Sequence, residues 1–233
     1  MKVLAIESSA VTASVAIMTE DTLIAEYTIN YKKTHSQTLL PMIDEIFSMV
    51  QLKPDDVDVI AVSKGPGSFT GLRIGAATGK GIALALDKKM VAVPTLAAMA
   101  YNLYGDSRYI CPVMDARRKH LYSGIYTFDG DRLITVRDVN LESYDELAEE
   151  LAGLDGQVVL VGDGVDVAGD VLKEQLGDKC VLAPAHIKTQ RAGSVALLAK
   201  QMADNGEYTD ADELKPDYLR PSQAEREKAQ HES

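Results

Sequence analysis

The chain of 233 residues has no tryptophan, only three phenylalanines and two cysteines, and far fewer basic than acidic residues. Its 24 lysines and arginines against 35 aspartates and glutamates give a formal net charge of −11 at pH 7. This charge opposes direct binding to nucleic acid or to an anionic membrane, and the few aromatic rings offer little surface for stacking bases. We therefore expect a nucleic acid to be reached only through a partner.

The chain also lacks a long apolar run. No stretch is long enough to cross a bilayer. The apolar run at the N-terminus is too short for the hydrophobic segment of a signal peptide, and we predict a strand there. Cys111 and Cys180 are far apart and form no C-x-x-C pair, which is typical of buried free thiols in a reducing compartment. These features predict a cytoplasmic protein without membrane contact.

Sequence motifs of catalysis are also missing. The four histidines are isolated, so no H-E-x-x-H or similar pair of metal ligands exists, and no G-x-S-x-G nucleophile elbow is present. The sequence therefore predicts no catalytic residue and no metal site in this chain.

The order of elements repeats once along the chain. The first half predicts strands at 2–6, 13–18 and 23–29, a helix at 36–50, a strand at 59–62, a helix within 65–86 and a strand at 90–93. The second half predicts strands at 109–114, 121–128 and 133–139, a helix opened by the capping box of Ser143 and Glu146, a strand at 158–161, a helix at 167–176, a strand at 180–182 and a closing helix at 192–203. Such a duplication predicts an α/β protein with two lobes of mixed sheets flanked by helices, similar to the actin-like fold of sugar kinases and Hsp70 (the ASKHA fold). We place the N-terminal lobe at 1–104, the C-terminal lobe at 105–220 and a polar tail at 221–233.

The most distinctive stretch, at 65–86, reads GPGSFTGLRIGAATGKGIALAL. It predicts a tight turn after a strand and then a helix capped by Ser68 or Thr70. Gly71, Gly75 and Gly79 lie on one face of this helix and together cost about 3 kcal/mol in helix propensity. We expect something to pack closely against these glycines, and the candidates are a helix of the same domain, a second subunit or a bound ligand. The spacing does not fit a P-loop.

Two turns stand where active members of the actin-like fold bind nucleotide. They read Glu7-Ser8-Ser9 and Asp115-Ala116-Arg117, so an acid stands in each, but the glycines that would let backbone N–H groups reach phosphates are absent. Arg117 and Arg118 could still pair with a phosphate, although surface charge at a hairpin is the simpler reading. We interpret the set as a vestigial nucleotide cleft formed by Glu7, Ser8, Ser9, Asp115, Arg117, Gly162 and Gly164.

Several segments together resemble the TsaB family up to about residue 220. They are AIESS, HSQTLLPMID, GPGSFTGLRIG, VPTLAAMA, MDARRKHLYSGIY, VGDG and KPDYLR. The resemblance implies a non-catalytic subunit that binds and activates TsaD, which transfers threonylcarbamoyl to adenosine 37 of tRNAs reading ANN codons. It also implies the ATPase TsaE as a further partner, a homodimer when the chain is alone, and ATP, ADP or metal only through the partner complex.

The resemblance further implies that the two helices of the first lobe form the interface. The candidate residues are His35, Leu39, Leu40, Ile43, Gly71, Leu72, Gly75, Thr78, Gly79 and Ile82, and the sequence leaves open which of them face the chain's own sheet. On this reading Gly75→Leu leaves the chain folded but blocks association. TsaD carries a metal-holding histidine pair after the strand that here ends at Pro94, whereas this chain has TLAAMA there. The alternatives are a small-molecule kinase using Glu7 and Asp115 for magnesium and ATP, and a metalloprotease, which the missing ligand pairs disfavour.

Overall fold

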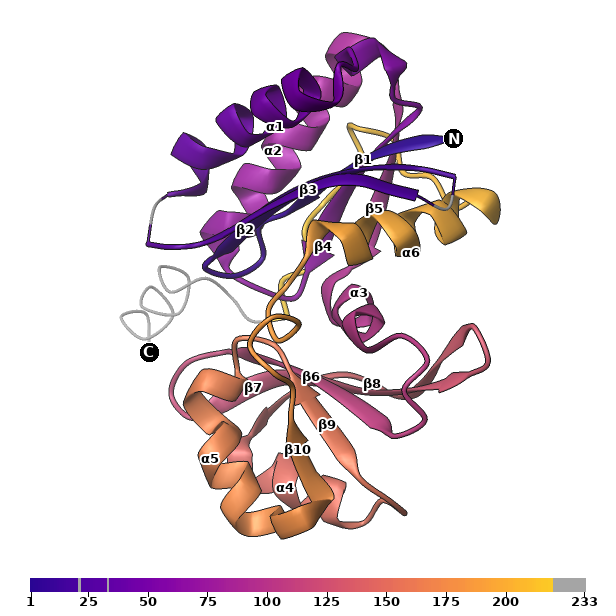
Figure 1. The fold of residues 1–233 in the computed structure, drawn as a ribbon. Coiled ribbons are helices and arrows are strands. Elements are labelled where there is room, and N and C mark those ends of the chain that lie inside the picture. The colour runs from indigo at the N-terminus through magenta and orange to yellow at the C-terminus, as the bar shows by residue number, and fades with distance from the viewer. Residues whose placement is uncertain (21, 33, 220–233) are drawn as a thin grey trace.

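The computed structural model describes residues 1–20, 22–32 and 34–219, which form two lobes built on one plan (Figure 1). The first lobe has a five-stranded sheet in the order β3-β2-β1-β4-β5. In it β1 pairs antiparallel with β2 and parallel with β4. The strands are β1 Lys2–Glu7, β2 Thr12–Thr19, β3 Thr22–Asn30, β4 Val59–Gly65 and β5 Lys89–Pro94.

The sheet of the second lobe repeats this topology in the order β10-β9-β6-β7-β8. Its central strand β6 again pairs antiparallel with one neighbour, β7, and parallel with the other, β9. The strands are β6 Tyr109–Asp115, β7 His120–Asp129, β8 Arg132–Ser143, β9 Val158–Val161 and β10 Cys180–Leu182. The predicted duplication and the fold of two mixed sheets flanked by helices are therefore confirmed.

Each sheet is covered by helices on both faces, and this explains the continuous apolar run of β1. Leu4 and Ile6 point into a core beneath α1 and α2, whereas Val3 and Ala5 point into a core beneath α6. In the second lobe α4 and α5 cover one face and α3 the other. The helices are α1 His35–Val50, α2 Phe69–Leu86, α3 Thr95–Ala100, α4 Tyr144–Ala152, α5 Val165–Leu176 and α6 Ala192–Asp204, with short 3-10 turns at Pro54–Asp56, Tyr101–Leu103 and Gly177–Lys179.

The last helix of each half packs on the sheet of the other half. The closing helix α6 contacts β1, β2 and β5 of the first lobe, and α3, which the sequence analysis did not predict as a helix, contacts β6 and β7 of the second (Figure 1). Small residues of α6, among them Ala192, Ala196 and Ala199, let it lie close against the first sheet. The boundary that assigned 105–220 entirely to the second lobe is therefore wrong from α6 onward.

Residues 207–219, which we call the C-terminal strap, also belong to the first lobe. The backbone N–H of Thr209 donates to the carbonyl of Met90 at 2.9 Å, and that of Asp217 donates to the carbonyl of Lys64 at 2.6 Å. Leu214 is buried in the core beneath α1 and α2. The predicted polar tail at 221–233 lies outside the described residues.

None of the helices in the described ranges is both long enough and apolar enough to span a bilayer.

Candidate functional site

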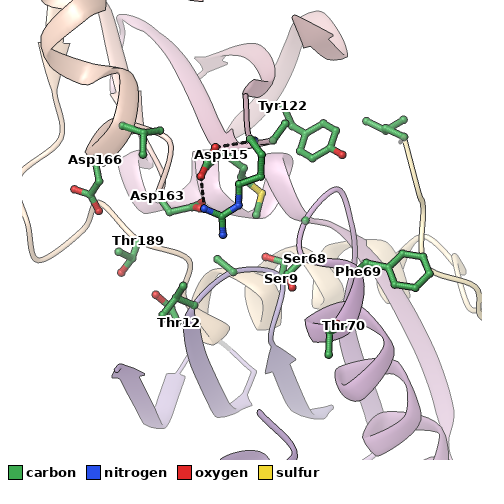
Figure 2. Close-up of a pocket in the computed structure, with 18 of the residues that line it drawn as sticks. Ser9, Thr12, Ser68, Phe69, Thr70, Asp115, Tyr122, Asp163, Asp166 and Thr189 are labelled. Carbon is green, nitrogen blue, oxygen red and sulfur yellow. Dashed lines mark hydrogen bonds and ion pairs between the residues drawn. The ribbon is translucent and has the colours of Figure 1, made fainter. Parts of the chain in front are cut away.

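A cavity of about 570 Å³ lies where the two lobes meet. The first lobe contributes the loop after β1 and the start of α2, and the second lobe contributes the end of β6 and the start of α5 (Figure 2). The C-terminal strap supplies Asp217, Tyr218 and Leu219 to the wall. The topology therefore places this cleft at the carboxyl ends of the central strands, where open α/β sheets usually bind ligands.

Only three of the seven residues predicted for a vestigial nucleotide cleft line this cavity: Ser9, Asp115 and Arg117. Thr12, Ser68, Tyr122 and Asp163 also line it, and the sequence analysis did not select them. Thr12 and Tyr122 stand in strands β2 and β7, and Ser68 and Asp163 belong to the GPGSFTGLRIG and VGDG segments, which the sequence analysis had noted for other reasons. Only the fold brings the four side chains to one cavity.

Glu7 lies behind the cleft wall, with only 1% of its surface exposed. One carboxylate oxygen accepts the backbone N–H of Ser9 at 2.6 Å, and the other accepts the hydroxyl of Ser63. Burial raises the pKa of the Glu7 carboxyl above its ordinary value, and the hydrogen bonds from Ser63 and Ser9 oppose that shift. Glu7 therefore holds β1, β4 and the following turn together, and its position contradicts the role of magnesium ligand that the kinase alternative required.

The remaining predicted cleft residues pack against their own chain. A Cβ at Gly162 would lie 2.2 Å from the carbonyl oxygen of Val113, and one at Gly164 would lie 2.8 Å from its carbonyl carbon. The hydroxyl of Ser8 points to α2 and donates to the carbonyl of Gly71 at 2.9 Å. Ser8, Gly162 and Gly164, which we interpreted as part of a vestigial nucleotide cleft, therefore pack against the chain itself and do not line the cavity.

Three acids in the second-lobe wall are each held by another side chain. Asp115 forms an ion pair with Arg117 at 2.9 Å, and Asp166 forms one with Lys188. Asp163 accepts a hydrogen bond of 2.7 Å from Gln190, and burial raises the pKa of its carboxyl despite that bond. Within the described residues no three His, Cys, Asp or Glu side chains are grouped to hold a metal ion. The cleft is thus polar, and each of these three carboxylates is already paired with another side chain of the same lobe.

Ser9 is the one cleft hydroxyl that is buried without a hydrogen-bond partner among the described residues.

The glycine face of α2 packs against residues of its own lobe. A Cβ at Gly71 would lie 2.1 Å from the carbonyl oxygen of Ser8, and one at Gly75 would lie 2.1 Å from the Ser8 hydroxyl. A Cβ at Gly79 would lie 2.5 Å from the side chain of Val62. The interpretation of these glycines as the seat of a neighbouring chain is therefore wrong, and the expectation that Gly75→Leu leaves the fold intact is wrong for the same reason.

Several other predicted interface residues are core residues. Leu39, Ile43 and Leu72 are buried, and His35 is buried with its Nε2 donating to the carbonyl of Ala10 at 2.7 Å. His35 thus fixes the loop after β1 and does not face solvent. Of the predicted set, Leu40 is exposed, and Thr78 and Ile82 are half-buried.

The opposite sides of α1 and α2 are open to solvent and carry apolar side chains. Leu40 and Met49 of α1 are 57% and 66% exposed, and Leu84 of α2 is 62% exposed. On α2 the exposed residues Ala77, Gly81 and Ala85 recur at every fourth position, and a Cβ at Gly81 would meet nothing within 4 Å. Because an α-helix turns once every 3.6 residues, Leu40 and Met49 lie on opposite flanks of α1. We call the four exposed residues of α2, Ala77, Gly81, Leu84 and Ala85, the outer helix face.

The C-terminal strap is fixed beside the cleft by an aromatic cluster. The ring of Tyr218 lies 4.4 Å from that of Phe69, and Arg73 donates to the Tyr218 hydroxyl at 3.0 Å. Lys64 pairs with Asp217 at 3.1 Å. These contacts join the strap to the first turn of α2.

Comparison with known proteins identifies the family. Residues 22–228 match the family model described as TsaD, tRNA N6-adenosine threonylcarbamoyltransferase. The chain is 33% identical over 228 residues to the tRNA threonylcarbamoyladenosine biosynthesis protein TsaB of Bacillus subtilis, covering 97% of this chain and 96% of that protein.

Solved structures agree with this assignment. YeaZ from Pseudomonas aeruginosa superimposes with a TM-score of 0.80 at 27% identity, covering 94% of this chain and 99% of that one. A ROK hexokinase from Thermus thermophilus superimposes with a TM-score of 0.50 at 11% identity over 88% of this chain and 100% of that one, which shows a shared sugar-kinase-like fold. The chain therefore belongs to the TsaB family of tRNA threonylcarbamoyladenosine biosynthesis proteins.

Proposed function

We propose that this chain is a non-catalytic subunit of the threonylcarbamoyladenosine synthesis complex, which binds and activates a TsaD-type transferase acting on adenosine 37 of tRNAs that read ANN codons. The observation that carries the proposal is the outer helix face, an exposed apolar surface on a member of the TsaB family. On this proposal the chain works in the cytoplasm and forms a homodimer when the transferase is absent. The ATPase TsaE joins the same complex.

The residues around the cleft support a role without catalysis. Glu7, at the end of the first central strand, is buried and holds its neighbours, and Asp115 is paired with Arg117. The segment after β5, where the transferase family is expected to carry metal-binding histidines, forms α3 and buries Thr95, Leu96 and Met99. Any ATP, ADP or metal of the complex would on this proposal be held with the partner.

The shape of the outer helix face suits a partner helix. Small exposed residues on α2, Ala77, Gly81 and Ala85, would let a second backbone approach closely, and Leu84 beside them offers apolar area. A transferase that shares this fold carries equivalent helices. The same surface on a second copy would explain self-association when the transferase is absent.

Placing a charged side chain on this apolar face tests the proposal. Leu84→Glu is expected to weaken binding to the TsaD-type protein of the same organism by about tenfold or more, because it removes an apolar side chain worth about 1.5–3 kcal/mol when buried. Val171→Glu is the matched control, since Val171 is also an exposed apolar residue on a helix, α5 of the other lobe. Mass measurement of the mixed proteins in solution and threonylcarbamoyladenosine formation give the two readouts.

Both variants should unfold at the temperature of the wild-type chain, since both positions are exposed. Docking through the outer helix face would be contradicted if Leu84→Glu bound the transferase as tightly as the wild-type chain, or if Leu84→Glu and Val171→Glu lost the same amount of affinity.

A further inference from the structure

The turn between β6 and β7 holds three cationic residues in an unfavourable backbone conformation. The φ angles of Arg117, Arg118 and Lys119 are 67°, 57° and 58°, in the left-handed region that glycine and asparagine normally occupy. Each such residue costs about 1 kcal/mol relative to glycine. A turn selected only for its backbone would carry glycine here, so the side chains themselves must have a use.

The same three residues are the longest run of consecutive cations in a chain whose net charge is −11. All three are exposed. Arg117 is paired with Asp115, but Arg118 and Lys119 form no ion pair with any carboxylate of residues 1–20, 22–32 and 34–219. Two exposed cations next to Arg117, which lines the cleft, therefore have no ion-pair partner in the described part of the chain.

The acids beside the turn do not cancel this charge. Asp115 is neutralised by Arg117 and Asp166 by Lys188. Asp163 lies in the cavity wall and accepts a hydrogen bond from Gln190, and burial raises the pKa of its carboxyl. The tip of the turn thus carries three consecutive exposed cations in a chain whose net charge is strongly negative, and this favours an anionic partner.

The composition of the tip favours phosphate over a protein surface. Protein interfaces have apolar centres depleted in lysine, and this chain presents such an apolar surface elsewhere, on the outer helix face. Arginine and lysine suit the oxygens of a nucleic-acid backbone, which they bind without reading sequence.

We propose that the Arg117–Lys119 turn binds backbone phosphates of the tRNA within the complex, with Arg118 and Lys119 as the phosphate contacts. This inference rests on the proposed function, because the complex brings the tRNA to the chain. It departs from the expectation, drawn from the net charge, that tRNA is reached only through the partner. Arg117 acts as a positioning residue, since its pair with Asp115 keeps that carboxylate from repelling the phosphates.

Glycine substitution separates tRNA binding from folding. The double variant Arg118→Gly with Lys119→Gly relieves the left-handed strain, so its thermal midpoint should equal or exceed that of the wild type. In complex with the transferase, it should bind an unmodified tRNA transcript about tenfold more weakly in low salt. The slope of log affinity against log salt should fall by about 1.5, since each lost phosphate contact contributes about 0.7–0.9.

A control with the same change in net charge excludes a general electrostatic effect. Lys53→Ala with Arg132→Ala removes two exposed cations, and Arg132 lies beyond the far end of β7 from the turn. This control should keep the wild-type affinity and salt slope for the transcript.

The outcomes separate the inference from the proposed function. A wild-type chain that does not join the transferase refutes the proposed function and the inference with it. If the complex forms but the glycine variant binds the transcript with wild-type affinity and slope, the inference alone is overturned. It is also overturned if the variant loses the transferase in the absence of RNA, because the turn is then a protein contact.

Discussion

The same substitution at two glycines of α2 should have opposite effects on stability. At Gly75, alanine places its Cβ 2.1 Å from the hydroxyl oxygen of Ser8 and 3.3 Å from the Ser8 Cβ. At Gly81, alanine meets no atom within 4 Å. Neither glycine has a positive φ, so both sites accept alanine in the backbone. The pair therefore isolates packing from helix propensity.

The size of each effect follows from the contacts. Alanine gains about 1 kcal/mol over glycine in helix propensity at either site. At Gly75 the helix must shift and the buried Ser8 hydroxyl must also give up its hydrogen bond to Gly71, which costs about 1–3 kcal/mol for overpacking and about 1–3 kcal/mol more for an unsatisfied hydroxyl. We expect Gly75→Ala to lose about 3 kcal/mol of unfolding free energy and Gly81→Ala to gain up to about 1 kcal/mol.

Thermal unfolding of the purified variants measures both changes in stability. For a protein of this size, about 2–4 °C corresponds to 1 kcal/mol, so the midpoint should fall by roughly 6–12 °C for Gly75→Ala and rise by roughly 2–4 °C for Gly81→Ala. Measurements at two protein concentrations exclude changes in self-association. Adding Ser8→Ala to Gly75→Ala should recover part of the loss, because it removes the colliding oxygen. A Gly75→Ala chain as stable as the wild type would mean that the glycine face is open, as an interface would require.

Two further predictions concern the buried carboxyl and the strap. Since burial raises the folded-state pKa of Glu7, the native state retains its proton longer, so wild-type stability should fall as pH rises above the ordinary value of 4.5. Glu7→Gln should lose this pH dependence of the unfolding free energy. If urea unfolding at pH 5 and pH 8 gives the same change in unfolding free energy for both proteins, the prediction is contradicted. Tyr218→Ala should lower the unfolding free energy by about 1–2 kcal/mol through its lost contacts with Phe69 and Arg73. It should also speed proteolytic cleavage of the strap, and an unchanged cleavage rate would show that the ring does not fix it.

Features with a short-range signal could be predicted from the sequence. The apolar run of β1, the helical period of α1 and the cap at Ser68 are local patterns, and the structure has all three, with the Ser68 hydroxyl accepting the N–H of Gly71 at 3.3 Å. Helix α3 was missed because its six residues are too few to show a period.

Long-range contacts could not be predicted. The sequence shows that Gly71, Gly75 and Gly79 share a helix face, but not that the loop after β1 fills it. It places Glu7 at a turn expected to bind nucleotide, but its burial depends on Ser63, 56 residues away. The outer helix face could be recognised only once the buried side of α2 was known.

The exchange of α3 and α6 means that neither half of this chain is a complete structural unit. Without the second half, the first sheet would present Val3, Ala5 and Val91 to water, because α6 would be gone. Without the first half, the second sheet would lose the cover that α3 gives to Ile110 and Met114. Duplication has thus produced an obligate pair: fragments cut at the repeat boundary should aggregate when expressed separately and regain a native fold only when mixed.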